Sequence, residues 1–532
     1  MRSAQALVLP VLLAISPPTN ERWTRTEIGN LVILSNASDR AARGVAENLL
    51  RLRQTLMEVS KLETRSPIPT YVYAFRNEAS FDPYRVAIVG KNRESVRGIF
   101  FSLPDSNRIL IQADVAIDDV VYHEFTHYFI RNTVVGIPLW LDEGLAEFYA
   151  TFSPVGGARS VRLGLPNKIH LTFLQEHGLM PLPELFAFEP LKLPPADLRV
   201  EQFYGESWLL AHYLLIGNPK RGAGLGPFLS LVYEGHPLAE SFEKAFGVSM
   251  KDMQAEVNTY LQRGRYNAVA YTLSETGTRE IPQPKEIPRD EVLASLGDLL
   301  THTDARQDGA IFLKEAIAAN PRNAIALADL ADIQFSAGQP EEAEKLYKRS
   351  IEAAGSDYRP FVWYGNRLIV DLQKKAREGE RIAPAAIASV RELASRAIQL
   401  APDDPNGYAI LGATYTFLGE KPAEGIKASE KSFQIAPARL DVAADLVLLY
   451  RIAGQEKASA SIIDRVIGPS SVERFLTEAK DNLTLGDYVR GMNLIESGRK
   501  PEGEALLQRA LENVTNTNLK HKIVTILATK SR

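Results

Sequence analysis

The sequence contains no cysteine, and this absence excludes several kinds of chemistry at once. A chain without cysteine has no disulfide bonds, no thiolate metal ligands and no cysteine nucleophile, so imidazole and carboxylate groups are the ligands left for a transition metal. A strong excess of one charge is also missing, because 61 basic and 65 acidic side chains give a formal net charge of −4 over 532 residues. Such a balance provides no electrostatic attraction for a phosphate backbone. We therefore expect no nucleic-acid partner.

Long hydrophobic runs are also absent beyond the N-terminus, so no transmembrane segment is expected. Residues 1–16 combine a basic residue with an apolar run of signal-peptide length. Ala14 and Ser16 have the small-residue spacing of a cleavage site, but Pro17 follows directly and leaves the cleavage point open. We predict a signal peptide over residues 1–16 and a periplasmic or secreted protein, the alternative being a frayed apolar N-terminus.

The segment His123-Glu124-Phe125-Thr126-His127 places two histidines four residues apart. In an α-helix such residues lie one above the other, so both imidazoles can reach one metal ion at ~2.0–2.1 Å. Glu124 then lies beside the metal and cannot easily ligate it. A general base belongs there, because the metal lowers the pKa of a bound water to about 7. The segment predicts Zn²⁺ as the cofactor.

A third ligand is expected from residues 140–147, whose sequence is WLDEGLAE. A helix that begins near this segment can fold back antiparallel to the first helix and present Glu143 to the metal. Asp142 and Glu147 compete for this role, but Asp142 points off the Glu143 face and Glu147 needs a shifted helix. Gly144 is expected to let the two helices pack closely.

The HExxH motif followed by WLxEGLA resembles the gluzincin metallopeptidases, in their peptidase-MA-like branch. The resemblance implies that His123, His127 and Glu143 bind zinc and that Glu124 is the general base. It also implies that Glu147 orients a ligand histidine. The expected activity is hydrolysis of a peptide or protein substrate. The Gly-x-Met-x-Asn exopeptidase signature of the aminopeptidase branch is not found upstream, so endopeptidase and exopeptidase both stay open.

Tyr204 lies about as far beyond the third ligand as the tyrosine that aminopeptidase-type gluzincins use to bind the oxyanion. This resemblance implies a catalytic role for Tyr204. The alternatives are a tyrosine packed at a helix start, or His212 as the oxyanion donor. We expect His170, His177 and His236 to be solvated surface residues.

Residues 23–265 are predicted to form an α+β zincin-like metallopeptidase domain, with a mixed sheet and a helical subdomain. The expected elements are strands over 31–35, 70–74, 98–102 and 108–112 and helices over 40–60 and 116–131. Asp39 is a plausible cap for the first helix. The last two strands are separated by turn residues and read as a hairpin. In gluzincins the sheet edge beside the zinc helix binds substrate by strand addition, and either hairpin strand is a candidate; an ordinary hairpin is the alternative.

Residues 266–288 are polar and proline-rich and are predicted to be a linker. From 289 to 532 the chain repeats with a period of about 34 residues, which is typical of tetratricopeptide repeats. In the first unit the matching positions are Leu293, Gly297, Gly309, Ala316 and Pro321. We predict an all-α superhelix of about six helix pairs with a groove for a protein partner, the alternative being a generic helical bundle.

Two functions follow from these features. The first is an exported zinc peptidase whose repeats bind a substrate or partner. The second is a repeat scaffold for protein interactions that carries an inactive or structural zinc domain. We favour the enzyme because an inactive remnant would usually have lost Glu124 or a ligand.

Overall fold

The computed structural model describes residues 15, 17, 18 and 21–528, with gaps at 62–67, 91–95, 115–118, 135–136, 157–158, 195–196, 235, 275–280, 419, 438, 464–465 and 467–483. The predicted signal peptide, residues 1–16, lies outside the described residues except for Ile15. Among the described residues, no helix is both long and apolar enough to cross a membrane.

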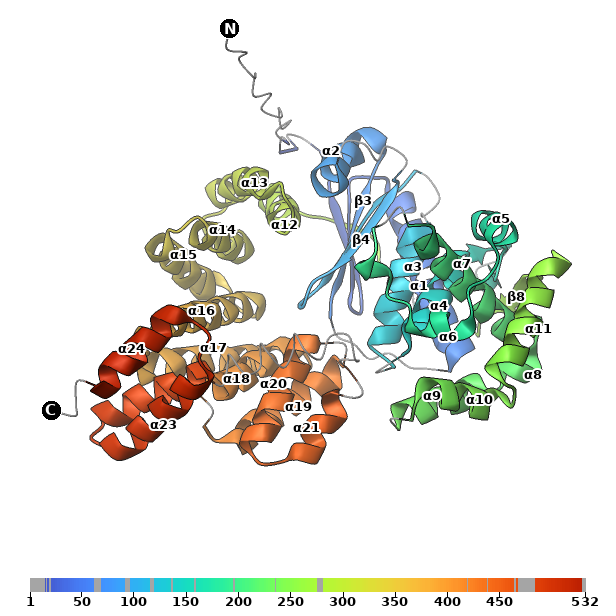
Figure 1. Cartoon of the computed structure of the whole chain (residues 1–532). Helices are drawn as coiled ribbons and strands as arrows, with labels where there is room; N and C mark the ends of the chain where they lie inside the picture. The colour runs from blue at the N-terminus through green and yellow to red at the C-terminus, as the bar shows by residue number, and fades with distance from the viewer. Residues whose placement is uncertain are drawn as a thin grey trace, which may run out of the picture.

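The N-terminal half contains a mixed six-stranded sheet with the strand order β4-β5-β3-β2-β1-β9 (Figure 1). The strands are β1 (Thr24–Ile28), β2 (Leu31–Ser35), β3 (Thr70–Phe75), β4 (Gly98–Ser102), β5 (Asn107–Gln112) and β9 (Lys285–Glu286). Strands β2, β3 and β5 run parallel to one another, whereas β1, β4 and β9 run antiparallel to their neighbours. All four predicted strands are present, and β4 and β5 form the predicted hairpin.

Helices α1 (Asp39–Ser60) and α3 (Asp119–Arg131) cover one face of this sheet. Alternate strand residues such as Ile33, Val72 and Ile109 share a core with Leu49 of α1 and Phe125 of α3. The cap of α1 differs from the prediction, because the side chain of Ser38 accepts a hydrogen bond from the backbone of Ala41. Asp39 is already the first residue of the helix. Helix α2 (Glu78–Val89) follows β3.

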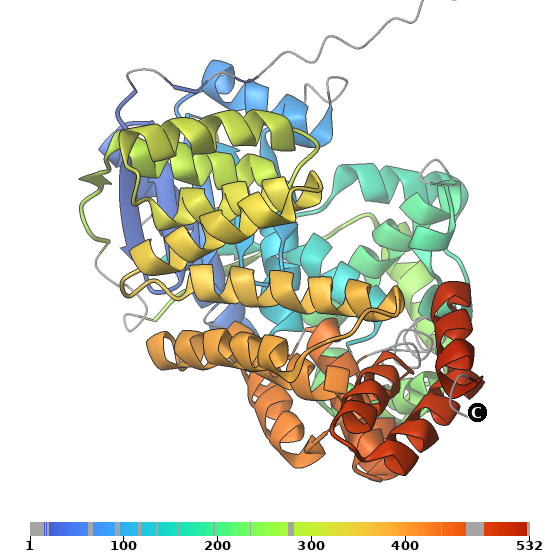
Figure 2. The same cartoon turned by 90° about the vertical axis from the view of Figure 1, so that its left-hand side faces the viewer.

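The other face of the sheet is covered by the first helices of the C-terminal half. Leu34, Tyr73 and Leu110, the intervening strand residues, share a second core with Leu293 and Leu296 of α12 (Arg289–Thr301). Figure 2 shows these yellow-green helices in front of the blue strands. Strands buried on both faces read as nearly continuous apolar runs, as β2 and β3 do.

The prediction of a separating linker over residues 266–288 is therefore wrong for its described residues. Strand β8 (Val269–Thr272) pairs with β7 (Ser160–Leu163), which also pairs with β6 (Ser153–Pro154) in a small second sheet. Strand β9 pairs with β1 in the large sheet. The two predicted domains share a core because the apolar outer face of the large sheet needs a cover, which α12 supplies.

A helical subdomain follows α3 and has its own core, which includes Trp140, Trp208, Phe228 and Phe242. Its elements are α4 (Leu139–Ala150), α5 (Lys168–His177), α6 (Leu182–Ala187), η1 (Pro190–Lys192), α7 (Leu198–His212), η2 (Tyr213–Gly217), α8 (Pro219–Gly222), α9 (Leu225–Tyr233), α10 (Leu238–Phe246) and α11 (Met250–Arg263). A Cβ atom at Gly144 would collide with the backbone oxygen of Ser207 on α7. Gly144 thus lets α7 approach α4, and not α3 as the sequence suggested.

The C-terminal half is a series of helix pairs that curves around one end of the sheet (Figure 1). The pairs are α12 with α13 (Arg306–Ala319), α14 (Ala324–Ser336) with α15 (Pro340–Ala353), α16 (Arg359–Arg377) with α17 (Pro384–Leu400), α18 (Pro405–Leu418) with α19 (Pro422–Ile435), α20 (Leu440–Ile452) with α21 (Glu456–Ile462), and a helix over 484–496 with α23 (Lys500–Asn513), before α24 (Thr517–Ala528). A Cβ atom at Gly309 would lie 3.0 Å from the carbonyl oxygen of Gly297, so small residues occupy the closest contact within the first pair. This is the all-helical arrangement that the period predicts.

Candidate metal centre

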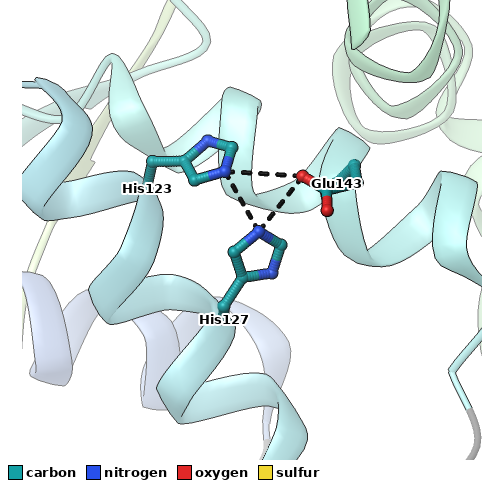
Figure 3. Close-up of side chains that lie close together, drawn as sticks. All are labelled: His123, His127 and Glu143. Carbon is teal, nitrogen blue, oxygen red and sulfur yellow. Dashed lines mark hydrogen bonds and ion pairs between the residues drawn. The ribbon is translucent and has the colours of Figure 1, made fainter. Parts of the chain in front are cut away.

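Three side chains from two neighbouring helices converge on one point (Figure 3). His123 and His127 lie one turn apart on α3, and Glu143 reaches them from α4. The Nε2 atoms of the two histidines are 3.0 Å apart. The Oε2 atom of Glu143 lies 3.1 Å from Nε2 of His127 and 3.4 Å from Nε2 of His123.

These separations fit a tetrahedral zinc ion. Ligand atoms that lie ~2.0–2.1 Å from a tetrahedral metal are roughly 3.3–3.4 Å from one another. The three measured distances of 3.0, 3.1 and 3.4 Å are therefore close to those of one face of a tetrahedron. A site with three protein ligands keeps a fourth position for water or substrate, as catalytic zinc sites do.

Asp142 orients the ring of His127. Its Oδ1 atom lies 2.9 Å from Nδ1 of His127, and its Oδ2 atom accepts a 2.9 Å hydrogen bond from Arg131. A carboxylate acceptor places the ring proton on Nδ1, which leaves the lone pair of Nε2 for a metal. The sequence analysis considered Asp142 as a competing ligand, and the structure places it on the opposite side of the His127 ring. The position of Asp142 next to Glu143 in the sequence did not predict that Asp142 would orient the ring of His127.

Glu147 contacts the other ligand histidine and begins a chain of charged groups. Its Oε1 atom lies 3.4 Å from Nδ1 of His123, and its Oε2 atom lies 3.1 Å from Nε2 of His170. The Nδ1 atom of His170 lies 3.0 Å from Glu201 of α7. Glu147 therefore connects His123 of the cluster with His170.

The prediction that His170 is a solvated surface residue is wrong. His170 is only 7% exposed and lies between two carboxylates from α4 and α7. Burial lowers the pKa of its ring, but the hydrogen bonds to Glu147 and Glu201 outweigh burial and raise this pKa above the usual value. These partners are distant in sequence, so no local pattern could identify them. His177 and His236 are exposed, as expected.

The acidic members of the site are held in their ionised form. Burial alone would raise the pKa of Glu143, but hydrogen bonds from His123 and His127 lower it to about 2. Burial has the same opposing effect on Glu147, whose pKa is lowered to about 2 by His123 and His170. An ionised Glu143 is the form that binds a cation.

Glu124 lies next to the cluster and is partly exposed. Within the described part of the chain, its carboxylate has no hydrogen-bond or ion-pair partner. Tyr204 on α7 is half-buried, and burial together with the charges of Glu143, Glu147 and Glu124 raises its pKa to about 12. This raised pKa keeps the hydroxyl of Tyr204 protonated at neutral pH.

His212 does not take part in the site. It is completely buried in the helical subdomain. Its Nε2 atom lies 3.0 Å from the carbonyl oxygen of Gly164, and its Nδ1 atom lies 2.9 Å from the hydroxyl of Tyr260. Both nitrogens are thus engaged inside the core, so the alternative of His212 as oxyanion donor is wrong.

Of the two hairpin strands, β4 has an edge to which no other strand is paired in the described part of the chain. It is the outermost strand of the sheet, whereas β5 is paired on both sides. Strand β4 also contacts the metal helix α3.

The tetratricopeptide repeat family matches residues 307–359, which run from α13 to the start of α16. The C-terminal half therefore contains tetratricopeptide repeats, which are protein-interaction modules. A search of curated proteins gives no match.

Several solved structures of helical proteins are similar to part of the chain. The crystal structure of MamA protein shares 19% identity and covers 36% of this chain and 94% of its own, with a TM-score of 0.26. PilF of Pseudomonas aeruginosa shares 15% identity and covers 44% and 97%, with a TM-score of 0.29. A tetratricopeptide repeat protein from Parabacteroides merdae shares 12% identity and covers 58% and 100%, with a TM-score of 0.26.

Proposed function

We propose that this protein is an exported, zinc-dependent peptidase whose N-terminal sheet and following helices form a zincin-like domain. The observation that carries the proposal is the convergence of His123, His127 and Glu143 at distances that suit tetrahedral zinc. A periplasmic or secreted location rests on the apolar N-terminus alone.

The surrounding residues have the chemistry that peptide hydrolysis needs. Bound zinc would polarise the scissile carbonyl and acidify a water molecule. Glu124 would take a proton from the attacking water and deliver it to the leaving amine, a task suited to a carboxylate that has no other partner among the described residues. Tyr204, which stays protonated, donates a hydrogen bond to the oxyanion. Strand β4 offers its free edge to the substrate backbone.

Metal analysis and peptide cleavage together test this proposal. The purified protein should contain about one zinc ion, and His127→Ala or Glu143→Ala should lose most of it. Glu124→Gln should keep zinc but lose 10²–10⁴-fold in hydrolysis rate, because the amide cannot accept the proton. His177→Ala is the matched control, since His177 is an exposed histidine away from the cluster.

Retention of full zinc by both ligand variants would show that the metal site is wrongly assigned. Cleavage by Glu124→Gln at the wild-type rate would contradict the catalytic role of Glu124. Tyr204→Phe should keep zinc and lose about 10²–10³-fold in rate, the value of one oxyanion donor.

The second candidate function is a protein-interaction scaffold. It is favoured by the repeat match at residues 307–359, the part of the chain where a known family is recognised. A zinc-loaded wild-type protein that cleaves no member of a broad peptide library would support this function over the peptidase.

A further inference from the structure

The turn of the β4–β5 hairpin is held by two helices of the repeat domain. The Nε1 atom of Trp363 on α16 donates a 2.7 Å hydrogen bond to Oδ2 of Asp105. Arg439, which directly precedes α20, donates a 3.2 Å hydrogen bond to the carbonyl oxygen of Pro104. Figure 1 shows the hairpin reaching down toward these helices. Residues more than 250 positions apart in the sequence thus meet at this turn.

Arg439 is itself fixed in place. It donates a 2.7 Å hydrogen bond to Asn406 and forms an ion pair with Asp441. Its side chain is only 11% exposed. The residue therefore presents a rigid donor to the turn, because its other groups are already bound.

Further contacts join β3, the strand beside the hairpin, to the first repeats. Arg359 of α16 donates a 2.9 Å hydrogen bond to the hydroxyl of Tyr71, and Tyr73 donates a 3.0 Å hydrogen bond to the carbonyl oxygen of Ser295 on α12. Helices α12 and α16 are the first helices of their pairs, as is α20. In a superhelix of such pairs, equivalent helices line the same side. This side of the repeats binds the sheet of the same chain.

The hairpin turn matters because β4 is short and paired on one side only. It has five residues, and its register with β5 runs from Gly98 opposite Ile111 to Ser102 opposite Asn107. The turn between the strands is closed by a 2.7 Å hydrogen bond from the backbone of Leu103 to Ser106. A two-stranded hairpin at the edge of a sheet opens easily. Contacts that hold its turn in place therefore limit the opening of the hairpin.

We propose that the repeat domain acts in cis as a clamp, in which Trp363 and Arg439 position the edge strand β4 beside the metal helix α3. The natural ligand of this part of the repeats is the β4–β5 turn of the same chain. The consequence for substrate binding rests on the peptidase function proposed above, whereas the clamp itself does not.

Hydrogen exchange on the full-length, zinc-loaded protein tests the clamp directly. Trp363→Phe keeps an aromatic ring but removes the donor to Asp105, and Asp105→Ala removes the acceptor. Amides of residues 96–112 should exchange about tenfold faster in either variant, the size expected for loss of a hydrogen bond to a charged group. The double variant should behave like each single one, because both substitutions break the same contact.

The matched control is Arg367→Met, one turn further along α16. Arg367 pairs with Asp332 and stacks on Phe335, both within the repeats. Its loss should leave exchange in residues 96–112 unchanged. Equal exchange of the hairpin in Trp363→Phe, Asp105→Ala and Arg367→Met would overturn the clamp.

Peptide kinetics separate the clamp from the peptidase proposal. With an active enzyme, Trp363→Phe should raise KM several-fold, with kcat and zinc content close to wild type, because the substrate edge is loosened and the metal site is not. An unchanged KM would refute the role of the clamp in substrate binding. If the wild-type protein cleaves no peptide, the peptidase proposal fails while hydrogen exchange still decides the clamp.

Discussion

The buried ion pair between Arg108 and Asp298 offers a strong test of whether the sheet and the repeats are one folded unit. Arg108 on β5 is 2% exposed and Asp298 on α12 is 6% exposed, and their charged atoms are 2.7 Å apart. The guanidinium also lies 4.5 Å from the ring centre of Tyr71. The perturbation is Arg108→Met, which keeps an apolar side chain of similar length and removes the charge.

The expected loss is large because a second buried acid lies nearby. Removal of one partner from a buried pair costs about 3–5 kcal/mol, since the other charge is left without compensation. Burial and the charge of Asp298 raise the pKa of Asp329 well above its usual value, while Arg108 opposes this shift. Arg108→Met therefore removes the closest cation from Asp298, which keeps the weaker influence of His302 and Arg359, and leaves it near a second buried acid.

The loss should also depend on pH. Burial raises the pKa of Asp298, but the charge of Arg108 outweighs it and lowers this pKa below the usual 3.8. The stability from the pair is therefore fully present above pH 3.8 and is lost as the pH falls through the lower value in the folded protein. The difference between wild type and Arg108→Met should be greatest near neutral pH and should shrink in acid.

Urea unfolding at pH 7, followed by circular dichroism and tryptophan fluorescence, measures this effect. Arg289→Met is the matched control, because Arg289 and Glu315 are also 2.7 Å apart but 49% and 40% exposed. An exposed pair of this kind contributes about 0–1 kcal/mol. The double variant Arg108→Met with Asp298→Asn should recover much of the loss, since no buried charge of the pair then lacks its partner.

Two results would refute this reasoning. The first is a loss for Arg108→Met no greater than that for Arg289→Met. The second is a wild-type protein whose repeat helices unfold at a lower urea concentration than the sheet, which would show that the two halves do not share one cooperative core.

Three further predictions concern the helical subdomain. Burial raises the pKa of Glu206 to about 8 from the usual 4.5, so the folded protein loses stability as the pH rises between these values. Glu206→Gln should therefore melt higher than wild type at pH 9 and similarly at pH 4; an equal difference at both values would contradict this. Asp142→Ala removes the acceptor that orients a ligand histidine and should weaken zinc binding about 10–100-fold in a chelator competition, and unchanged affinity would exclude this role. His170→Ala removes the group that lies between Glu147 and Glu201 and should cost about 1–3 kcal/mol at pH 6 in urea unfolding, although Glu147 keeps its contact with His123. Because the pKa of His170 is raised, this cost should shrink as the pH rises through its value in the folded protein, and His177→Ala should show neither effect.

The part of the site that the sequence could predict is the part encoded by local spacing. The separation of four residues places His123 and His127 on one helical face, and the second motif lies on the next helix, so a return of that helix along α3 brings Glu143 to them. His170 and Glu201 come from helices whose approach is set by tertiary packing. No spacing of residues within the sequence predicts the contact between His170 and Glu201.

The domain boundary was misjudged for a similar reason. Proline and polar residues over 266–288 are typical of a linker, yet short strands at each end of this segment pair with residues far away in the sequence. The apolar runs of β2 and β3 indicate burial on both faces. They do not say which part of the chain covers the second face, because any apolar helix could do so.

The shared core also imposes an order on synthesis. Leu34, Tyr73 and Leu110 leave the ribosome early, but the α12 residues that cover them are translated roughly 180 residues after β5, about 10–40 s later at usual rates. Over that interval α2, whose Phe81 and Tyr84 belong to the same core, can cover part of this face, and the part that α12 buries stays open. The core on this face can therefore be completed only after α12 has been translated, and the apolar surface exposed until then is the kind that chaperones bind.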